Sequence, residues 1–250
     1  MDRKIRIGAV NYLNTKPLIY GFGQGLLQDK ASLVLDYPAQ LAQQLINGQI
    51  DIGLIPVAAI PRLPQHYLIG RHCIACEGEV ASVCLFSQVP IEQIDTILMD
   101  YQSRTSVALL KILLREHWQV QPQLLDTAPG YEQQISGTMA GLVIGDRALN
   151  LQGQFAYVYD LGLAWQALTG LPFVFAAWVA TAPQAADFVA AFDDCVGLGL
   201  QHLPEIVAAH ALPHYSLHRY YTENIQYHLD ERKEQALGLF LSKLKGSKNE

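Results

Sequence analysis

Apolar and polar residues alternate over short stretches of the chain, and this pattern predicts strands that take turns with helices. Residues 5–10 form an apolar alternation typical of a buried strand, and the polar turn at 11–15 leads into an apolar segment opened by Pro17. Proline is tolerated in the first turn of a helix, so a helix is predicted there. A second strand is predicted at 32–37, then an amphipathic helix, and a third strand at 50–56. This order is typical of an α/β fold with a mostly parallel sheet.

The second part of the chain repeats that order. The apolar segment 94–99 predicts a strand, which runs through the polar turn 100–106 into a helix. The helix end, glycine stop and strand at 46–55 are also echoed at 135–144. A repeated unit of this kind predicts two α/β lobes of similar build. Three more helices are predicted towards the C-terminus, at 183–201, 204–210 and 230–244.

Two long apolar runs, 80–87 and 171–180, are predicted to be strands that cross between the two lobes. On this basis the first lobe comprises 1–87 and 179–250, and the second lobe comprises 88–178. No low-complexity linker occurs, so strands rather than a flexible tether are expected to join the lobes. A cleft then lies between them, and interfaces between domains are favoured ligand sites.

Composition and charge narrow the class of partner. Half of the 250 residues are hydrophobic, which is enough for a sizeable core. Only 16% are charged, the net charge is −6 and no basic stripe occurs, so nucleic acid is not expected as a partner. No run of about 18 apolar residues occurs, so no membrane span is predicted, and a membrane is not expected as a partner. No secretory signal precedes the first strand, which predicts a cytoplasmic protein; the oligomeric state is left unpredicted.

The cysteines do not form a convincing metal-binding pattern. Cys73 and Cys76 have the C-x-x-C spacing, but they lie in an apolar, strand-like run. A second such pair, or paired histidines at ligand spacing, is missing from the sequence. We therefore predict buried free thiols and no metal site.

Polar turns at the carboxyl ends of parallel strands meet at one crevice, and here they supply the candidate ligand-binding residues. Asn14 or Thr15 is predicted to cap the first helix, and the Ser/Thr cluster at 103–106 caps a second. Each helix N-terminus can hold a carboxylate, so a small doubly anionic ligand is predicted. The candidates are Asn11, Tyr12, Asn14, Thr15, Ile55, Pro56, Ser82, Ser103, Arg104, Thr105, Ser106, Gly145 and Asp146.

Acidic and basic residues near these turns leave several roles open. The motifs of serine hydrolases, zinc proteases and nucleotide-binding loops are absent from the sequence. The candidate general bases are Asp51, Asp100, Asp146 and Asp160. Each of these residues also suits a structural role in a turn or a helix cap. The nearby cations are Lys16, Arg104 and Arg147. Each of them either adds positive charge to the cleft or forms an ion pair at the surface.

Several motifs taken together resemble the chorismate dehydratase family of the futalosine route to menaquinone. In chain order they are 6–18, 51–56, 82–83, 103–110, 145–149, 157–162, and Trp165 with 168–176. The likeness spans 5–180 and becomes thin over the helices that follow. Asn11 departs from the family's usual pattern. A sibling family of the same pathway fits less well, because it carries a histidine where this chain has 144–146.

The resemblance implies both a fold and an activity. The family is similar to periplasmic binding proteins of type II, with two lobes, two crossing strands and a cleft between the lobes. It implies elimination of water from chorismate, giving 3-[(1-carboxyvinyl)oxy]benzoate without a cofactor. Chorismate carries two carboxylates, which agrees with the two predicted helix N-termini.

The implied reaction removes a proton from the ring carbon that bears the enolpyruvyl ether, and hydroxide leaves from the neighbouring carbon. No histidine lies in the predicted pocket, so we predict that the enolpyruvyl carboxylate of the substrate takes the proton. Asn14 and Ser82 are then predicted to orient that carboxylate and the leaving hydroxyl, and positioning of this kind can lower a barrier by several kcal/mol. Asp146 or another carboxylate as general base is the alternative.

A non-enzymatic role is a second hypothesis. Because binding proteins and enzymes share this fold, a solute-binding protein for a small carboxylate anion would show the same pattern of lobes and turns. The missing export signal argues against a transport role.

Overall fold

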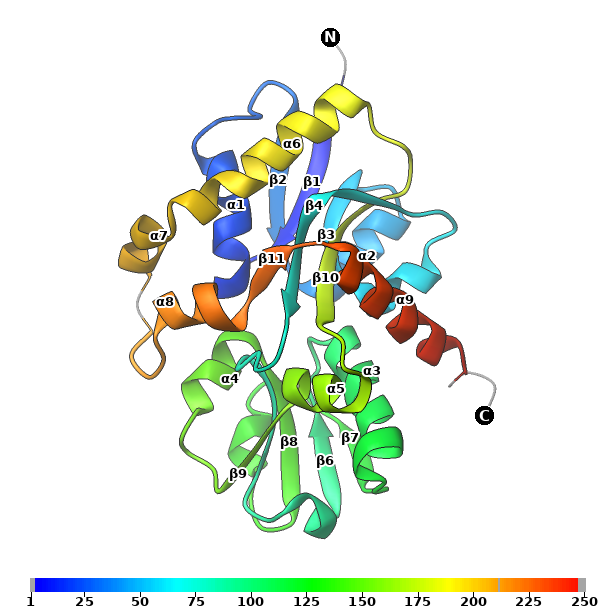
Figure 1. The fold of residues 1–250 in the computed structure, drawn as a ribbon, viewed down its shortest axis with the longest axis vertical. Coiled ribbons are helices and arrows are strands. Elements are labelled where there is room, and N and C mark those ends of the chain that lie inside the picture. Colours follow the sequence, from blue (N-terminus) through cyan, green and yellow to red (C-terminus); the bar gives the residue numbers. More distant parts are fainter. Residues whose placement is uncertain (1–2, 211, 247–250) are drawn as a thin grey trace.

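The computed structural model describes residues 3–210 and 212–246 of the chain. Two lobes are stacked along the longest axis, and each is built on one sheet with helices outside it (Figure 1). The first strand and the last helix both belong to the upper lobe of that view. The chain therefore enters the second lobe once and returns from it once.

The first sheet has six strands in the order β11-β4-β10-β3-β1-β2. Its strands are β1 (Ile5–Val10), β2 (Ala31–Asp36), β3 (Ile52–Pro56), β4 (Tyr67–Cys76), β10 (Phe173–Ala180) and β11 (Gln226–His228). β1 pairs in parallel with β2 and β3, whereas β10 runs antiparallel to β3 and β4.

The second sheet has five strands in the order β7-β6-β8-β5-β9. Its strands are β5 (Val83–Ser87), β6 (Thr96–Met99), β7 (Gln123–Asp126), β8 (Met139–Ile144) and β9 (Tyr157–Asp160). β6 pairs in parallel with β7 and β8, whereas β5 runs antiparallel to β8 and β9.

The two sheets repeat one arrangement, which confirms the predicted two-lobed fold. In each, a central parallel strand is flanked by two parallel neighbours, as β2-β1-β3 and β7-β6-β8. Each trio is extended by an antiparallel strand that arrives from the other lobe, β10 in the first sheet and β5 in the second. The expectation of mostly parallel sheets was wrong, because apolar strand patterns do not reveal strand direction.

Sheet membership also places the two long apolar runs. β5 belongs to the second sheet and β10 to the first, so the chain passes between the lobes at 77–82 and again at 161–172. Every residue of β5 is buried, and such a run does not indicate which sheet it joins. The predicted lobes, 1–87 with 179–250 and 88–178, stay a prediction; by sheet membership alone, β5 goes with the second lobe and β10 with the first.

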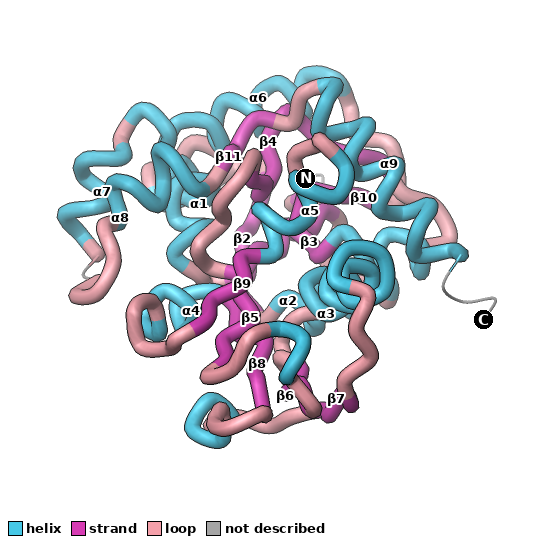
Figure 2. Tube along the Cα trace, turned by 60° about the horizontal axis from the view of Figure 1, so that its bottom comes forward, coloured by secondary structure: helices cyan, strands magenta, loops and turns pink. Residues whose placement is uncertain are grey.

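Helices cover the outer faces of both sheets (Figure 2). They are α1 (Lys16–Gly23), α2 (Pro38–Ile46), α3 (Arg104–Leu113), α4 (Gly145–Leu151), α5 (Leu161–Thr169), α6 (Ala186–Leu198), α7 (Leu203–Ala209), α8 (Leu217–Arg219) and α9 (Glu231–Gly246). α6, α7 and α9 confirm the three helices predicted towards the C-terminus. α8 and the strand β11 were missed. Within the described ranges, no helix is long and apolar enough to cross a membrane.

Aromatic packing ties the last helix to the first sheet. Trp165 of α5 and Phe240 of α9 both pack edge-to-face on Phe173 of β10, with ring centroids 5.2 and 5.0 Å from that of Phe173. All three side chains are almost fully buried. Burying one large apolar side chain contributes about 1.5–3 kcal/mol. One apolar core runs through both lobes, from Ile7 in the first to Leu109 in the second.

Candidate active site

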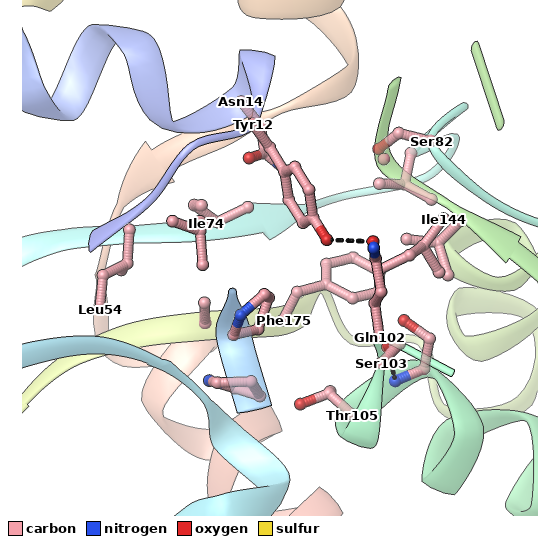
Figure 3. Close-up of a pocket in the computed structure, with 18 of the residues that line it drawn as sticks. Tyr12, Asn14, Leu54, Ile74, Ser82, Gln102, Ser103, Thr105, Ile144 and Phe175 are labelled. Atoms are coloured by element: carbon pink, nitrogen blue, oxygen red, sulfur yellow. Dashed lines mark hydrogen bonds between the residues drawn. The ribbon is translucent and has the colours of Figure 1, made fainter. Parts of the chain in front are cut away.

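A cleft of about 600 Å³ lies where the carboxyl ends of strands from both sheets meet. Its polar lining residues are Tyr12, Asn14, Ser82, Gln102, Ser103, Thr105 and Ser106. Its apolar wall includes Val10, Leu54, Ile74, Ile144, Phe175 and Ile225. Figure 3 shows Asn14 and Ser82 on one side of this space and Ser103 and Thr105 on the other. The cleft thus combines a small set of neutral polar groups with an apolar wall.

The structure brings most of the predicted candidates together around the cleft. Those that line it are Tyr12, Asn14, Pro56, Ser82, Ser103, Thr105, Ser106 and Gly145. Those that are not among its lining residues are Asn11, Thr15, Ile55, Arg104 and Asp146. Their roles in substrate binding or catalysis stay predictions.

Local geometry explains three of the residues outside the cleft. Ile55 is fully buried in β3 between Leu54 and Pro56, which line the cleft; successive strand residues point to opposite faces. Thr15 is fully buried, and its hydroxyl donates to Asn14 Oδ1 at 3.2 Å. Asn11 is exposed and accepts a hydrogen bond from Lys16 Nζ at 2.7 Å.

The other two candidates outside the cleft, Asp146 and Arg104, lie in different surroundings. Asp146 lies in α4, and its Oδ1 accepts the backbone N–H of Leu13 at 3.1 Å, across the two lobes. Burial raises the pKa of Asp146, although this hydrogen bond opposes the rise. Arg104 lines a different groove, between α3 and α9.

The predicted side-chain cap at the first helix was wrong. The chain forms a 3-10 turn, η1 (Leu13–Thr15), which leads directly into α1, and neither turn nor helix has a side-chain cap. The N–H of Thr15 is already bonded to Tyr12 O at 3.0 Å. Because the Asn14 side chain is not used as a cap, it lines the cleft. The backbone carbonyl of Asn14 accepts a hydrogen bond from the hydroxyl of Tyr227 at 3.0 Å, which anchors the turn.

The second predicted cap is present. Ser103 Oγ accepts the N–H of Ser106 at 3.0 Å, so Ser103 caps α3 as expected from the sequence. Thr105 Oγ1 accepts the N–H of Ala58 at 3.2 Å and thereby links the two lobes. The first N–H groups of an α-helix have no partner inside the helix, and the positive end of its dipole attracts anions. The start of α3 is therefore suited to hold a carboxylate.

Ser82 is held by a strained segment between the lobes. Ala81 has a φ of 60°, which is unusual for a residue with a side chain, and Ser82 N donates to Val80 O at 2.7 Å in a tight turn. Asp160 accepts the N–H groups of Val80 and Ala81, at 3.0 and 2.7 Å from its Oδ2. Strained backbone of this kind is held by its surroundings and is often found at functional sites.

Tyr220 contacts Ser82 but was not predicted. Its hydroxyl donates to Ser82 Oγ at 2.8 Å, and both side chains are almost fully buried. Burial raises the pKa of Tyr220, whereas hydrogen bonding to Ser82 and Asn14 opposes the rise. Tyr220 lies in the π-helical turn η7 (Tyr220–Asn224), a region without a sequence signal. It joins the two predicted catalytic side chains to the C-terminal part of the chain.

Gln102 also lines the cleft without having been predicted, although it lies in the same polar turn as Ser103. Its Oε1 accepts the hydroxyl of Tyr12 at 2.5 Å across the cleft, shown as a dashed line in Figure 3, and Arg147 Nη2 at 3.3 Å. Arg147 is also paired with Asp100 at 2.7 Å and Glu132 at 2.5 Å. Arg147 therefore forms ion pairs, as one of the two interpretations of the sequence expected, although these pairs are partly buried and not on the surface.

The four candidate general bases all have other partners. Asp51 pairs with Arg3 and Arg6, and Asp100 with Arg147. Asp146 accepts the N–H of Leu13, and Asp160 accepts four backbone N–H groups. None of these carboxylates belongs to the lining of the cleft in the described part of the chain.

The four cysteines are buried free thiols, as expected. Across residues 3–210 and 212–246, no group of three or more histidine, cysteine, aspartate or glutamate side chains is placed to hold a metal ion.

Similar proteins with the same fold include solute-binding proteins. Protein AF1704 of Archaeoglobus fulgidus has a TM-score of 0.71 at 13% identity, and the match covers 98% of each chain. The periplasmic aliphatic sulphonate binding protein SsuA of Escherichia coli has a TM-score of 0.66 at 18% identity, covering 97% of this chain and 88% of that one. At these identities the likeness shows the fold alone.

Sequence comparison is more specific. The chain is similar to the chorismate dehydratase of Thermus thermophilus, with 29% identity over 268 residues that cover 95% of this chain and 94% of the relative. A family model described as menaquinone biosynthesis matches residues 5–245. Because this match spans nearly all of the sequence, the chain belongs to the menaquinone biosynthesis family.

Proposed function

We propose that the protein is a chorismate dehydratase, a hydro-lyase that converts chorismate into 3-[(1-carboxyvinyl)oxy]benzoate. Its family and its similarity to the curated dehydratase of Thermus thermophilus support this activity. The product, the futalosine route and a cytoplasmic location are part of the same proposal. The proposed reaction uses no cofactor, and aromatisation of the ring supplies its driving force.

The neutrality of the cleft is the observation that carries the mechanism. Its polar side chains are hydroxyls and amides, and burial together with Asp100 raises the pKa of Tyr12, its one ionisable lining residue among those described. The four candidate aspartates have other partners. A proton acceptor supplied by the substrate therefore fits this cleft better than a protein carboxylate. Asp146 would have to release the N–H of Leu13 to act as a base.

The proposed step uses two groups of chorismate itself. The enolpyruvyl carboxylate takes the proton from the ring carbon that bears the ether, while the hydroxyl leaves from the neighbouring carbon. The transferred proton then passes to the departing hydroxide, so that water leaves and the carboxylate is restored. Asn14 offers both a donor and an acceptor, and Ser82 a hydroxyl, to hold these groups in line.

The experiment that tests the proposal is incubation of the purified protein with chorismate. We expect the ultraviolet absorbance to change and a product to appear whose mass is that of chorismate less one water. Binding of chorismate without any change in its mass would instead favour a solute-binding protein for a small carboxylate anion.

Hydroxyls at the start of α3 are expected to contribute to binding. Thr105→Ala combined with Ser106→Ala should weaken chorismate binding by about 1–3 kcal/mol, because a carboxylate in the cleft loses buried partners. Calorimetric titration measures this. Thr222→Ala with Ser242→Ala removes the same two groups from exposed positions and should leave the affinity unchanged. Equal affinity for chorismate in both double variants would show that the start of α3 does not take part in binding.

The hydroxyl of Tyr220 is expected to position Ser82. Tyr220→Phe should lower turnover of chorismate about tenfold, the equivalent of about 1.4 kcal/mol, with a smaller change in KM. Tyr221→Phe is a matched control, because the neighbouring hydroxyl is buried without a hydrogen-bond partner in the described part of the chain. Steady-state kinetics of both variants decide the question. A similar loss in both would show that Tyr220 acts only through packing.

A further inference from the structure

A second groove, of about 870 Å³, lies on the side of the molecule where the two lobes meet outside the cleft. α3 of the second lobe forms one wall; the 3-10 helix η2 (Val57–Arg62) and the end of α9, both of the first lobe, form the other. Figure 1 shows α3 and α9 on the same side of the molecule. Four cations line this groove, namely Arg62, Arg104, Lys111 and Lys245. Apolar surface from Pro61 and Leu244 lies between them.

Among the residues that the structure describes, no carboxylate pairs with the cations of the groove. No acidic residue occurs in α3, in η2 or in residues 239–246 of α9. Glu116, which follows α3, is already bonded to Lys243 and to Arg115. Across the described part of the chain, none of the four cations forms a salt bridge. Like charges in one groove repel each other, and the protein as a whole is acidic, with a net charge of −6.

Arg104 is the most informative of these cations. It is the first residue of α3, at the positive end of the helix dipole, where a cation is unfavourable. Lys245 lies in the last turn of α9, where the dipole favours a cation, so its position has an ordinary explanation. Lys111 follows Arg104 by seven residues and therefore lies on the same face of α3. Helix stability does not explain why Arg104 stands there without an acidic partner.

We propose that this groove, referred to here as the basic groove, binds a small phosphate-bearing anion at a site separate from the cleft. Guanidinium groups hold phosphate oxygens in a fixed, two-pronged geometry, and the groove offers one such group from each lobe, Arg62 and Arg104. The apolar surface between them suits the organic part of such a ligand. The bound anion would relieve the repulsion among the four cations.

The basic groove adjoins the cleft without being part of it. Arg104 lines the groove, whereas Thr105, the next residue, lines the cleft and accepts the N–H of Ala58 of η2. An anion held between α3 and η2 would therefore join the two lobes beside that hydrogen bond. Its binding should raise the melting temperature, since a ligand that binds only the folded form stabilises it by an amount that grows with the logarithm of the ligand concentration above its Kd.

Calorimetric titration of the full chain with inorganic pyrophosphate at low salt tests the proposal. We expect saturable binding to one site, weakened at least tenfold in the variant that combines Arg62→Gln with Lys111→Gln. Both residues are exposed, so the fold should be kept, which a thermal melt checks. Lys4→Gln combined with Lys30→Gln removes two exposed cations elsewhere and should change the affinity less than twofold. Saturating chorismate should leave pyrophosphate binding in place.

Three results would overturn the proposal. Heat without saturation would show that no site exists. An equal loss of affinity in both double variants would mean that pyrophosphate responds only to the overall charge. Displacement of pyrophosphate by chorismate would place the anion in the cleft. The first two measurements use no chorismate, so their failure leaves the proposed activity untouched.

Discussion

Asn14→Asp is expected to lower turnover of chorismate by a factor of about 100 or more, the equivalent of about 2.7 kcal/mol. The new carboxylate would stand in the cleft beside a substrate that carries two negative charges. Protonation of the new side chain could restore binding, but the amide that aligns the substrate carboxylate would still be lost. The turn itself should persist, because the Asn14 side chain caps no helix and its backbone carbonyl still accepts the Tyr227 hydroxyl.

Steady-state turnover measured beside a thermal melt decides this prediction. Asn11→Asp provides a matched control, since it adds the same charge in the same turn but outside the cleft, next to Lys16. We expect it to change turnover far less. Near-normal turnover in folded Asn14→Asp protein would remove Asn14 from the mechanism. A collapsed melting temperature would instead show that Asn14 is structural.

Asp160→Ala is expected to reduce the free energy of unfolding by about 3–5 kcal/mol. The buried carboxylate accepts four backbone N–H groups, from Val80 and Ala81 between the lobes and from Gly162 and Leu163 at the start of α5. Without it these donors lose their acceptor in a buried position. The strained turn at Ala81 also loses a contact that holds it.

Denaturant unfolding of the variant measures the loss. Asp160→Asn keeps one acceptor oxygen, so it should lose less stability than the alanine variant. Asp187→Ala, at an exposed position in the first turn of α6, should change stability by less than about 1 kcal/mol. If Asp160→Ala unfolded at the denaturant concentration of the wild-type protein, the four hydrogen bonds would be replaced by water at no cost.

Local patterns predicted much of the fold and part of the site. The strand, polar turn and helix around 94–113 followed from alternation and from Ser103, because a helix cap is a short-range interaction. The position of Ile55 outside the cleft lining follows from the two-residue period of a strand, which puts Leu54 and Pro56 on one face and Ile55 on the other; its role in binding stays a prediction. Strand direction was not predictable from apolar patterns, so the antiparallel pairing of β10 with β3 and of β5 with β8 was not foreseen.

Long-range contacts account for what the sequence did not predict. Tyr220 meets Ser82 although 138 positions separate them, and no periodicity marks either residue as the partner of the other. Arg147 meets Asp100 and Glu132 from separate segments, so its ion pairs could be foreseen only as one of two possibilities. Such contacts depend on how the lobes are placed, which a pattern along the chain does not contain.

The hydrogen bonds that span the cleft have a kinetic consequence. Tyr12 with Gln102, Leu13 with Asp146, and Ala58 with Thr105 each join the two lobes through groups of the protein alone. At about 1 kcal/mol for each bond, molecules with all three broken are a small minority. A ligand that needs this open form binds with its intrinsic affinity multiplied by that fraction, and it associates more slowly than diffusion allows. A bound ligand cannot leave faster than the two lobes separate. Its residence time is therefore governed by hydrogen bonds between the lobes, which the ligand itself does not make.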